Sequence, residues 1–287
     1  MLHPLNPSGS TLVQAPANEV ITVHRAAFGE RWNSSFSTLR NDRRDCVKPN
    51  EDRAMLDPFR QTIVVADGIT RSKQADGSYP TPSPSARAAE VFCASVIAQA
   101  SVTPELTREQ FKTIIENANA AIAELNRELF PEYDFAERDR AGVAAVVGVI
   151  DGESMWLASI ADCWCVGAKG DETTRLAWEK TSHSRATYVR LGEVNAREQL
   201  RNKPGNPLSY GAFTGEPEAL HFVEYAKIDL RDYDRLVFAT DGLLAIPKED
   251  PLSVATMPAI QLMRYGLLMD KTHQETDDKT IVVLERK

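Results

Sequence analysis

Gln61–Thr70 has the sequence QTIVVADGIT, a run of β-branched and apolar residues that stops abruptly at Asp67-Gly68. A second stretch, Asp234–Leu244, has the sequence DRLVFATDGLL and stops in the same way at Asp241-Gly242. Each run is too apolar for a strand with one face in water, so each predicts a buried strand. Two predicted core strands therefore end at a carboxylate.

Thr276–Leu284, TDDKTIVVL, reverses this order, because Asp277 and Asp278 precede the apolar run. Antiparallel neighbours exchange their starts and ends along the edge of a sheet. If this last strand lies antiparallel to either of the first two, its beginning meets the end of its neighbour. The sequence therefore predicts that carboxylates from all three stretches converge.

A simpler interpretation applies to every Asp-Gly pair, because this dipeptide is ordinarily a turn signal. Asp151-Gly152 lies between two strand-like runs and predicts a tight hairpin, and Asp76-Gly77 lies in a polar, Pro-rich loop. We interpret both as turns. Asp67 and Asp241 differ because no returning strand follows them at once, although each alone is more typical of a turn than of a ligand.

The composition is that of an ordinary globular protein, with 287 residues, 43% hydrophobic and 26% charged. No apolar run approaches the roughly 20 residues that span a bilayer, and the N-terminus lacks the basic start and apolar core of a signal peptide. The net charge of -8 argues against a broad nucleic-acid surface. We therefore expect a cytoplasmic protein with no nucleic-acid or membrane partner.

The four cysteines, Cys46, Cys93, Cys163 and Cys165, form no CxxC pair. Their number and spacing predict reduced thiols rather than a disulfide framework or a zinc site. None of them lies in a phosphate-binding loop of the kind that a covalent cysteine nucleophile needs.

Helices are predicted between the strand regions. Residues 86–100 have helical character, with Ser83 or Ser85 as N-cap, and Thr107 with Gln110 has the spacing of a capping box for a second helix. A short helix is predicted to begin at Pro258. Strands, two helices and then many strands, without regular β-α alternation, predict an α+β fold of mainly antiparallel sheets covered by helices.

The remaining predictions concern the domain boundaries and two segments in the second half of the chain. Residues 1–18 are interpreted as an N-terminal tail, and residues 19–287 as a single domain. The Gly- and Pro-rich segment 197–217 predicts a loop long enough to form a lid or flap. The preceding segment, 176–184, is predicted to continue the β structure.

Six motifs in this order carry a resemblance to a known family: NED (Asn50–Asp52), VVADG (Val64–Gly68), AGVAAVV (Ala141–Val147), SIADCW (Ser159–Trp164), FATDG (Phe238–Gly242) and DDKT (Asp277–Thr280). Their order and spacing resemble the metal-dependent type 2C protein phosphatases, the PPM family, in their bacterial form. The resemblance covers nearly the whole chain after the tail. It implies an α-β-β-α sandwich of two mainly antiparallel sheets flanked by helix pairs, with two Mn²⁺ or Mg²⁺ ions at one end.

The resemblance also implies a role for each matching carboxylate. Asp67 would bridge the two ions, the Gly68 carbonyl would bind one of them, and Asp241 and Asp277 would complete the other. Oxygen ligands suit such hard cations on chemical grounds as well. Two ions that share a water can lower its pKa and present hydroxide to phosphorus, so no protein nucleophile is needed.

Three further acidic residues match the pattern more loosely. Glu51 and Asp52 would act on the ions directly or through bound water. Asp162 matches the Gly-Asp-Ser position of the family, which in bacterial members helps to hold a third ion.

Several positions depart from the family pattern. The usual phosphate-binding Arg is replaced by Val47, and the adjacent Lys48 is a candidate replacement, although an ammonium cannot make the bidentate contact of a guanidinium. The alternative is that Lys48 is a solvated surface residue. The family His after the first metal ligand is absent, since Thr70 follows Ile69, and His183 is better interpreted as structural than as catalytic.

Two functions of different class follow. The first is a Mn²⁺/Mg²⁺-dependent phosphatase that hydrolyses phosphoserine and phosphothreonine on protein substrates and opposes a serine/threonine kinase. The second is a catalytically weakened domain of the same fold that acts as a binding or regulatory module. The complete set of carboxylates favours the enzyme, and a small-molecule phosphatase is a lesser third interpretation.

Overall fold

The computed structural model describes residues 11–14, 20–40, 48–69, 76–103, 106–130, 140–273 and 277–287. In chain order the strands are β1 (Thr11–Gln14), β2 (Val20–Phe28), β3 (Trp32–Leu39), β4 (Arg53–Asp57), β5 (Thr62–Gly68), β6 (Val143–Asp151), β7 (Ser154–Ile160), β8 (Trp164–Lys169), β9 (Glu172–Ala177), β10 (Glu224–Asp229), β11 (Arg235–Ala239) and β12 (Lys279–Arg286). The helices are α1 (Pro84–Val102), α2 (Arg108–Leu129), α3 (Arg185–Leu191), α4 (Glu193–Leu200), α5 (Ala245–Glu249), α6 (Pro251–Thr256) and α7 (Ala259–His273).

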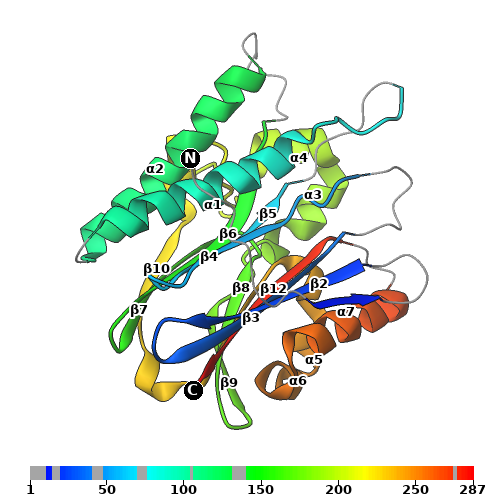
Figure 1. The fold of residues 1–287 in the computed structure, drawn as a ribbon. Helices are drawn as coiled ribbons and strands as arrows, with labels where there is room; N and C mark the ends of the chain where they lie inside the picture. The colour runs from blue at the N-terminus through cyan, green and yellow to red at the C-terminus, as the bar shows by residue number, and fades with distance from the viewer. Residues whose placement is uncertain are drawn as a thin grey trace.

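These elements form a layered sandwich (Figure 1). A five-stranded sheet has the order β10-β7-β6-β5-β4, and a seven-stranded sheet has the order β1-β2-β3-β12-β11-β8-β9. All neighbouring strands are antiparallel. Helices α1 and α2 cover the first sheet, and α5, α6 and α7 cover the second. The predicted α+β class is confirmed.

The central strands bury residues on both faces, which explains their continuous apolar runs. In β5, Val64 packs beneath α1 and α2, whereas Val65 faces the other sheet. In β12, Val282 faces the first sheet and Val283 packs beneath the second helix group. Successive residues of a strand point to opposite faces, so a strand between two cores needs apolar side chains at every position.

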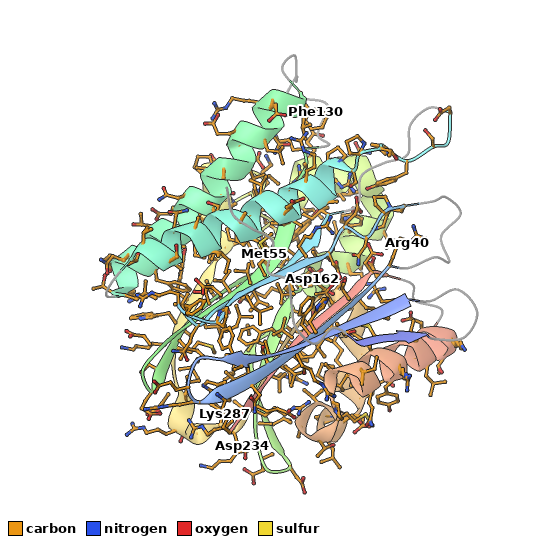
Figure 2. The ribbon with its side chains drawn as sticks, in the orientation of Figure 1. Arg40, Met55, Phe130, Asp162, Asp234 and Lys287 are labelled. Atoms are coloured by element: carbon orange, nitrogen blue, oxygen red, sulfur yellow. The ribbon has the colours of Figure 1, made fainter. Side chains whose placement is uncertain are left out.

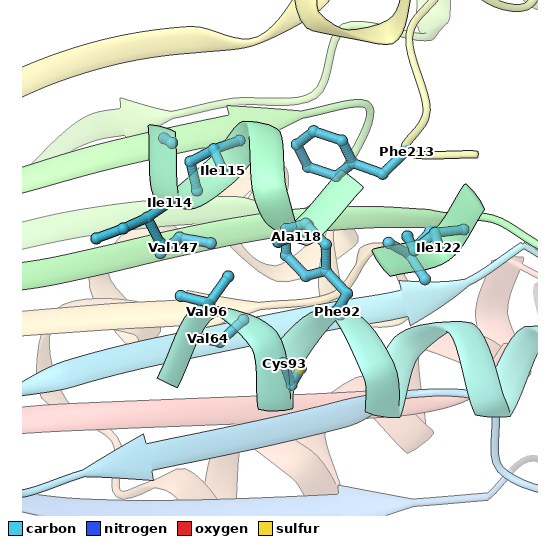
Figure 3. Close-up of a cluster of buried hydrophobic side chains, with 14 of the residues drawn as sticks. Val64, Phe92, Cys93, Val96, Ile114, Ile115, Ala118, Ile122, Val147 and Phe213 are labelled. Carbon is cyan, nitrogen blue, oxygen red and sulfur yellow. The ribbon is translucent and has the colours of Figure 1, made fainter. Parts of the chain in front are cut away.

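The core beneath the first helix pair is drawn in Figure 3. Phe92 of α1 stacks on Phe213, with ring centroids 4.6 Å apart. Val147 of β6 and Ile115 of α2 belong to the same buried cluster. This cluster, which also contains Val64 of β5, fixes both helices to the strand that carries Asp67.

Both predicted helix starts are confirmed. The Ser83 Oγ accepts a hydrogen bond from the Ala86 N–H at 3.1 Å and caps α1. At α2 the Gln110 N–H donates to the Thr107 Oγ1 at 3.2 Å, and the Thr107 N–H donates to the Gln110 Oε1 at 2.8 Å. These reciprocal bonds form the predicted capping box, which satisfies two backbone N–H groups that have no acceptor within the helix.

Other segments differ from expectation. β9 ends at Ala177, so the predicted continuation of β structure through residue 184 is wrong, and 182–184 form a 3₁₀ turn. The predicted loop begins later than expected, because α4 extends to Leu200. α3 buries no residue, so its sequence carries no apolar periodicity that could have predicted it.

The ends of the chain add two observations. Thr11–Gln14, the described part of the predicted tail, forms the edge strand β1 beside β2. The helix predicted to begin at Pro258 is α7 and extends to His273. Among the described residues, no helix has both the length and the apolar composition that crossing a bilayer requires.

Candidate metal centre

Three carboxylates from distant parts of the sequence lie together where core strands end. Asp67 is near the end of β5, Asp162 lies in the turn between β7 and β8, and Asp241 follows β11 at the start of the 3₁₀ turn Asp241–Leu243. One carboxylate oxygen of each lies within 4.8 Å of the others, and all three side chains are half-buried. Figure 2 labels Asp162 among the side chains of this region. Oxygens this close can bind one cation together.

The predicted antiparallel pairing of the last strand is confirmed. β12 pairs with β11, with Ala239 opposite Ile281, so the residues before β12 lie beside those after β11. Asp277 is therefore close to Asp241, and its negative charge contributes to raising the pKa of that carboxyl. Asp67 arrives from the other sheet, because β5 pairs with β4 and β6.

The glycines separate the two kinds of Asp-Gly pair. A Cβ on Gly68 would lie 2.7 Å from a backbone carbonyl oxygen of α1, and one on Gly242 would lie 2.1 Å from the carbonyl oxygen of Asp278. By contrast, Gly77 and Gly152 have φ of +81° and +63° and open space around the missing Cβ. The latter pairs are turns, as predicted. At Asp67 and Asp241 the glycine allows two backbones to pack closely beside the carboxylate.

Asp162 is presented by a tight local conformation. Ala161 has a φ of +61°, in the left-handed region that few non-glycine residues adopt. The Thr181 Oγ1 donates to the Asp162 Oδ2 at 3.4 Å. Burial, with smaller contributions from the charges of Asp277 and Glu179, raises the pKa of Asp162 to about 6.

Asp52 is buried at the start of β4. Its Oδ2 accepts a hydrogen bond from the Thr240 Oγ1 at 2.8 Å. Its Oδ1 is buried without a hydrogen bond of normal geometry to the described part of the chain. Burial, followed by the charges of Asp278 and Asp277, raises the pKa of Asp52 to about 7, although the Thr240 bond opposes the shift.

The remaining carboxyls are shifted in the same direction. Burial and then the charge of Asp52 raise the pKa of Asp67 well above its ordinary value. Burial and then the charge of Asp277 raise the pKa of Asp241 likewise. Charged carboxylates that repel one another and lack counter-charges are stabilised by a bound cation. The oxygen-only donor set and the buried oxygen of Asp52 therefore fit Mn²⁺ or Mg²⁺.

Lys48 and Glu51 occupy a different environment. The Lys48 Nζ lies 2.8 Å from the Glu51 Oε2 and 3.0 Å from the Asp278 Oδ2. The Lys48 side chain is 2% exposed, so the surface interpretation of this residue is wrong. The other Glu51 oxygen accepts hydrogen bonds from the hydroxyls of Tyr79, at 2.6 Å, and Ser83. The roles predicted for Lys48 as phosphate anchor and for Glu51 at the ions stay predictions.

Sequence reasoning did not identify two polar residues beside the acidic cluster. Thr240 binds Asp52 and also accepts from the Thr280 N–H at 3.0 Å, which joins β11 to β12. Lys279 is buried, with its Nζ 2.7 Å from the Asp270 Oδ2, and its charge partly opposes the raised pKa of Asp241. Lys279 directly follows two acidic residues in DDKT, and this is the sequence signal that could have indicated its position beside the acidic cluster.

The flap region lies beside Asp162. Burial is the main cause that raises the pKa of Tyr210 to about 12, and the negative charge of Asp162 is a smaller cause in the same direction. The His183 Nε2, in the 3₁₀ turn 182–184, lies 3.0 Å from the carbonyl oxygen of Ser209 in this region. That contact agrees with the structural role predicted for His183.

Buried asparagines hold residues 212–216, the C-terminal part of the predicted flap segment. The Asn119 side chain of α2 accepts from the Gly215 N–H at 3.0 Å and donates to the carbonyl of Glu216 at 3.0 Å. Asn126, two helical turns further along α2, donates to the carbonyl of Thr214 at 3.0 Å. The Asn202 side chain donates to the carbonyl of Ala212 and accepts a hydrogen bond from the Ala212 N–H. The C-terminal part of the predicted flap segment is therefore attached to α2.

Comparison with solved structures shows that this chain has the fold of the PPM-type serine/threonine phosphatases. The Mycobacterium tuberculosis serine/threonine phosphatase PstP/Ppp has a TM-score of 0.63 and 19% identity, over 89% of this chain and 99% of that chain. A catalytic-domain structure of PstP, with a TM-score of 0.62, 20% identity and coverage of 89% and 98%, is a complex with 2 manganese ions.

Two further structures extend the comparison. The S. agalactiae serine/threonine phosphatase has a TM-score of 0.61 and 15% identity, over 89% of this chain and 100% of that chain. PppA, a regulatory component of the T6SS in Pseudomonas aeruginosa, has a TM-score of 0.59 and 14% identity, over 90% and 99%. No protein-family model and no curated protein sequence matches this chain. The likeness thus lies in the fold, and the activity has to be argued from the site.

Proposed function

We propose that this protein is a Mn²⁺- or Mg²⁺-dependent phosphatase that hydrolyses phosphoserine and phosphothreonine on proteins. The observation that carries the proposal is the group formed by Asp67, Asp162 and Asp241, whose oxygens lie within 4.8 Å of one another. The same fold holds two manganese ions in the PstP catalytic domain. A hydrolase that uses metal-activated water needs such a group and no protein nucleophile.

The carboxylates have distinct roles in this proposal. Asp67 and Asp241 bind the ions, with the Gly68 carbonyl and Asp277 as further ligands, and Asp162 serves a third ion. When bound, the ions supply a water of lowered pKa and neutralise the charge of the phosphate. Asp52 carries a buried oxygen toward the same region and is oriented by its hydrogen bond from Thr240.

The proposed substrate is a phosphorylated protein, and the proposed setting is the cytoplasm, opposite a serine/threonine kinase. The solved structures of this fold include serine/threonine phosphatases from several bacteria, which supports a phosphoprotein substrate. The half-exposed positions of the three carboxylates make them accessible to a group on another protein.

The test is hydrolysis of p-nitrophenyl phosphate and of a phosphothreonine peptide by the full chain. The protein is first stripped with a chelator, and Mn²⁺ or Mg²⁺ is then restored. We expect phosphate release only with metal, its loss in Asp241→Asn, and normal release in the matched control Asp151→Asn, which alters an Asp-Gly pair in a hairpin turn. Folded protein that releases no phosphate with either ion would overturn the proposal.

The second candidate is a binding module of the same fold. The observation that favours it is the engagement of Lys48 in two buried ion pairs, which leaves the predicted phosphate anchor occupied. Mn²⁺ binding to the Asp67 group without turnover of either substrate would be the signature of such a module.

A further inference from the structure

The buried ammonium of Lys48 lies between two carboxylates. Its Nζ is 2.8 Å from the Glu51 Oε2 and 3.0 Å from the Asp278 Oδ2, and the side chains of all three residues are at most 2% exposed. Burial of one carboxylate is unfavourable unless a positive charge and hydrogen bonds accompany it. Here one cation serves two carboxylates that come from opposite ends of the sequence.

The protein also satisfies the remaining polar atoms of this group. The Glu51 Oε1 accepts from the hydroxyls of Tyr79 and Ser83, and the Glu51 N–H donates to the Asp278 Oδ2 at 3.0 Å. Ser83 is at the same time the N-cap of α1. The Glu51 carboxylate is therefore saturated by donors from the chain itself, which is the opposite of the situation at the Asp52 Oδ1.

We propose that Lys48 is a built-in cation that takes the place of a divalent ion at Glu51 and Asp278. Its ammonium pairs with both carboxylates and offsets one of their two negative charges, and ions then bind only on the side of Asp67 and Asp241. Lys48 is in this view a positioning residue that fixes the start of β4 to the start of β12, and it does not hold the substrate phosphate. The inference rests on the proposed metal site, because it divides the acidic residues between that site and Lys48.

The test compares metal binding by the full chain and by Lys48→Met, which keeps an unbranched side chain of similar length and removes its charge. Calorimetric titration of the metal-stripped proteins with Mn²⁺ is the direct measurement. In Lys48→Met the two carboxylate oxygens lose the ammonium that lies between them, so we expect the variant to bind about one more Mn²⁺ ion per chain than the wild type. We also expect a lower Tm in chelator and a larger rise of Tm on addition of Mn²⁺.

Two other variants separate this effect from loss of packing. Arg235→Met removes a buried cation at the opposite end of β11, where Arg235 pairs with Glu285 across to β12. It should lower the Tm without changing the number of Mn²⁺ ions. The double variant Lys48→Met with Asp278→Asn removes one carboxylate as well, and it should return the Mn²⁺ count to that of the wild type and recover part of the Tm in chelator.

The outcomes decide the matter even if one variant does not fold. If Lys48→Met folds and binds Mn²⁺ like the wild type, the inference is overturned. If Lys48→Met does not fold, the double variant decides, because recovery of folding supports charge neutralisation and equal failure contradicts it. The measurement is the number of Mn²⁺ ions bound by the variant minus the number bound by the wild type, so it is informative even if the wild type binds none. Mn²⁺ binding by the wild type tests the proposed function separately.

Discussion

Two groups of carboxylates lie at the same edge of the sandwich and are compensated in different ways. Among the described residues, no lysine or arginine forms an ion pair with Asp67, Asp162 or Asp241. Glu51 and Asp278, by contrast, share the buried ammonium of Lys48. The chain thus supplies a cation to one group of carboxylates, whereas the other group is the one that we propose to bind ions from solution.

The largest effect should come from removing a charge in the uncompensated group. Asp67→Asn or Asp241→Asn should lower metal-dependent turnover by about 10²- to 10³-fold or more, the scale expected for loss of a preorganised electrostatic group. Because like charges are removed, the Tm in chelator should stay equal or rise. Steady-state kinetics and thermal melts measure both, and turnover within a few-fold of the wild type would contradict the assignment.

The contact between the two groups can be broken through the backbone. Gly242→Ala would place a Cβ 2.1 Å from the carbonyl oxygen of Asp278 and force β11 and β12 apart at this edge. We expect it to lower the free energy of unfolding by about 3 kcal/mol, in the range of overpacking. The matched change Gly152→Ala, at a φ of +63° in open space, should cost about 1 kcal/mol. Equal losses in urea unfolding would refute this distinction.

The pH dependence of the metal-free protein should also report the uncompensated group. An acid with a raised pKa in the folded state binds more protons when folded, so the free energy of unfolding falls as pH rises between the two pKa values. That window extends from 3.8 to about 7 for Asp52 and from 3.8 to about 6 for Asp162.

Thermal melts in chelator should therefore show a Tm that falls between about pH 4 and pH 7, a trend that Mn²⁺ removes by neutralising the carboxylates. Asp52→Asn should flatten the trend. A Tm that rises over this range in chelator would show that these carboxyls are not destabilised by burial.

The smallest effect concerns the hydroxyl that orients Asp52. Thr240→Val keeps the shape of the side chain but removes its hydrogen bond to the Asp52 Oδ2 and its acceptance from the Thr280 N–H. We expect a loss of about 1–3 kcal/mol in the free energy of unfolding, the cost of leaving buried polar groups unsatisfied. Mn²⁺ affinity should fall only a few-fold. An unchanged unfolding midpoint in urea would argue against this bond.

Sequence periodicity was sufficient for the core strands and the first two helices. The apolar runs in the middle of β5, β11 and β12 are continuous because each strand separates two cores, and the caps at Ser83 and Thr107 are local. The helices α3 and α4 could not be predicted in this way, because they bury few side chains and are held by their surroundings.

The site was only partly accessible to the same reasoning. The positions of Asp67 and Asp241 after apolar runs indicated where they would lie, since a strand end fixes the next residue. The environment of Lys48 could not be predicted, because burial of a lysine depends on carboxylates that are close in space and distant in sequence, as Asp278 is. The six-motif resemblance ordered the acidic residues but did not distinguish those that the chain neutralises itself.

The hydrogen bonds from asparagines of α2 to residues 214–216 have an evolutionary consequence. Asn119 and Asn126 of α2 hold residues 214–216 through backbone atoms of those residues, whatever sequence precedes them. The stretch from α3 to Tyr210 can therefore be exchanged, lengthened or recombined between relatives while its exit stays anchored. Changes in this stretch would leave the positions of residues 214–216 unaltered.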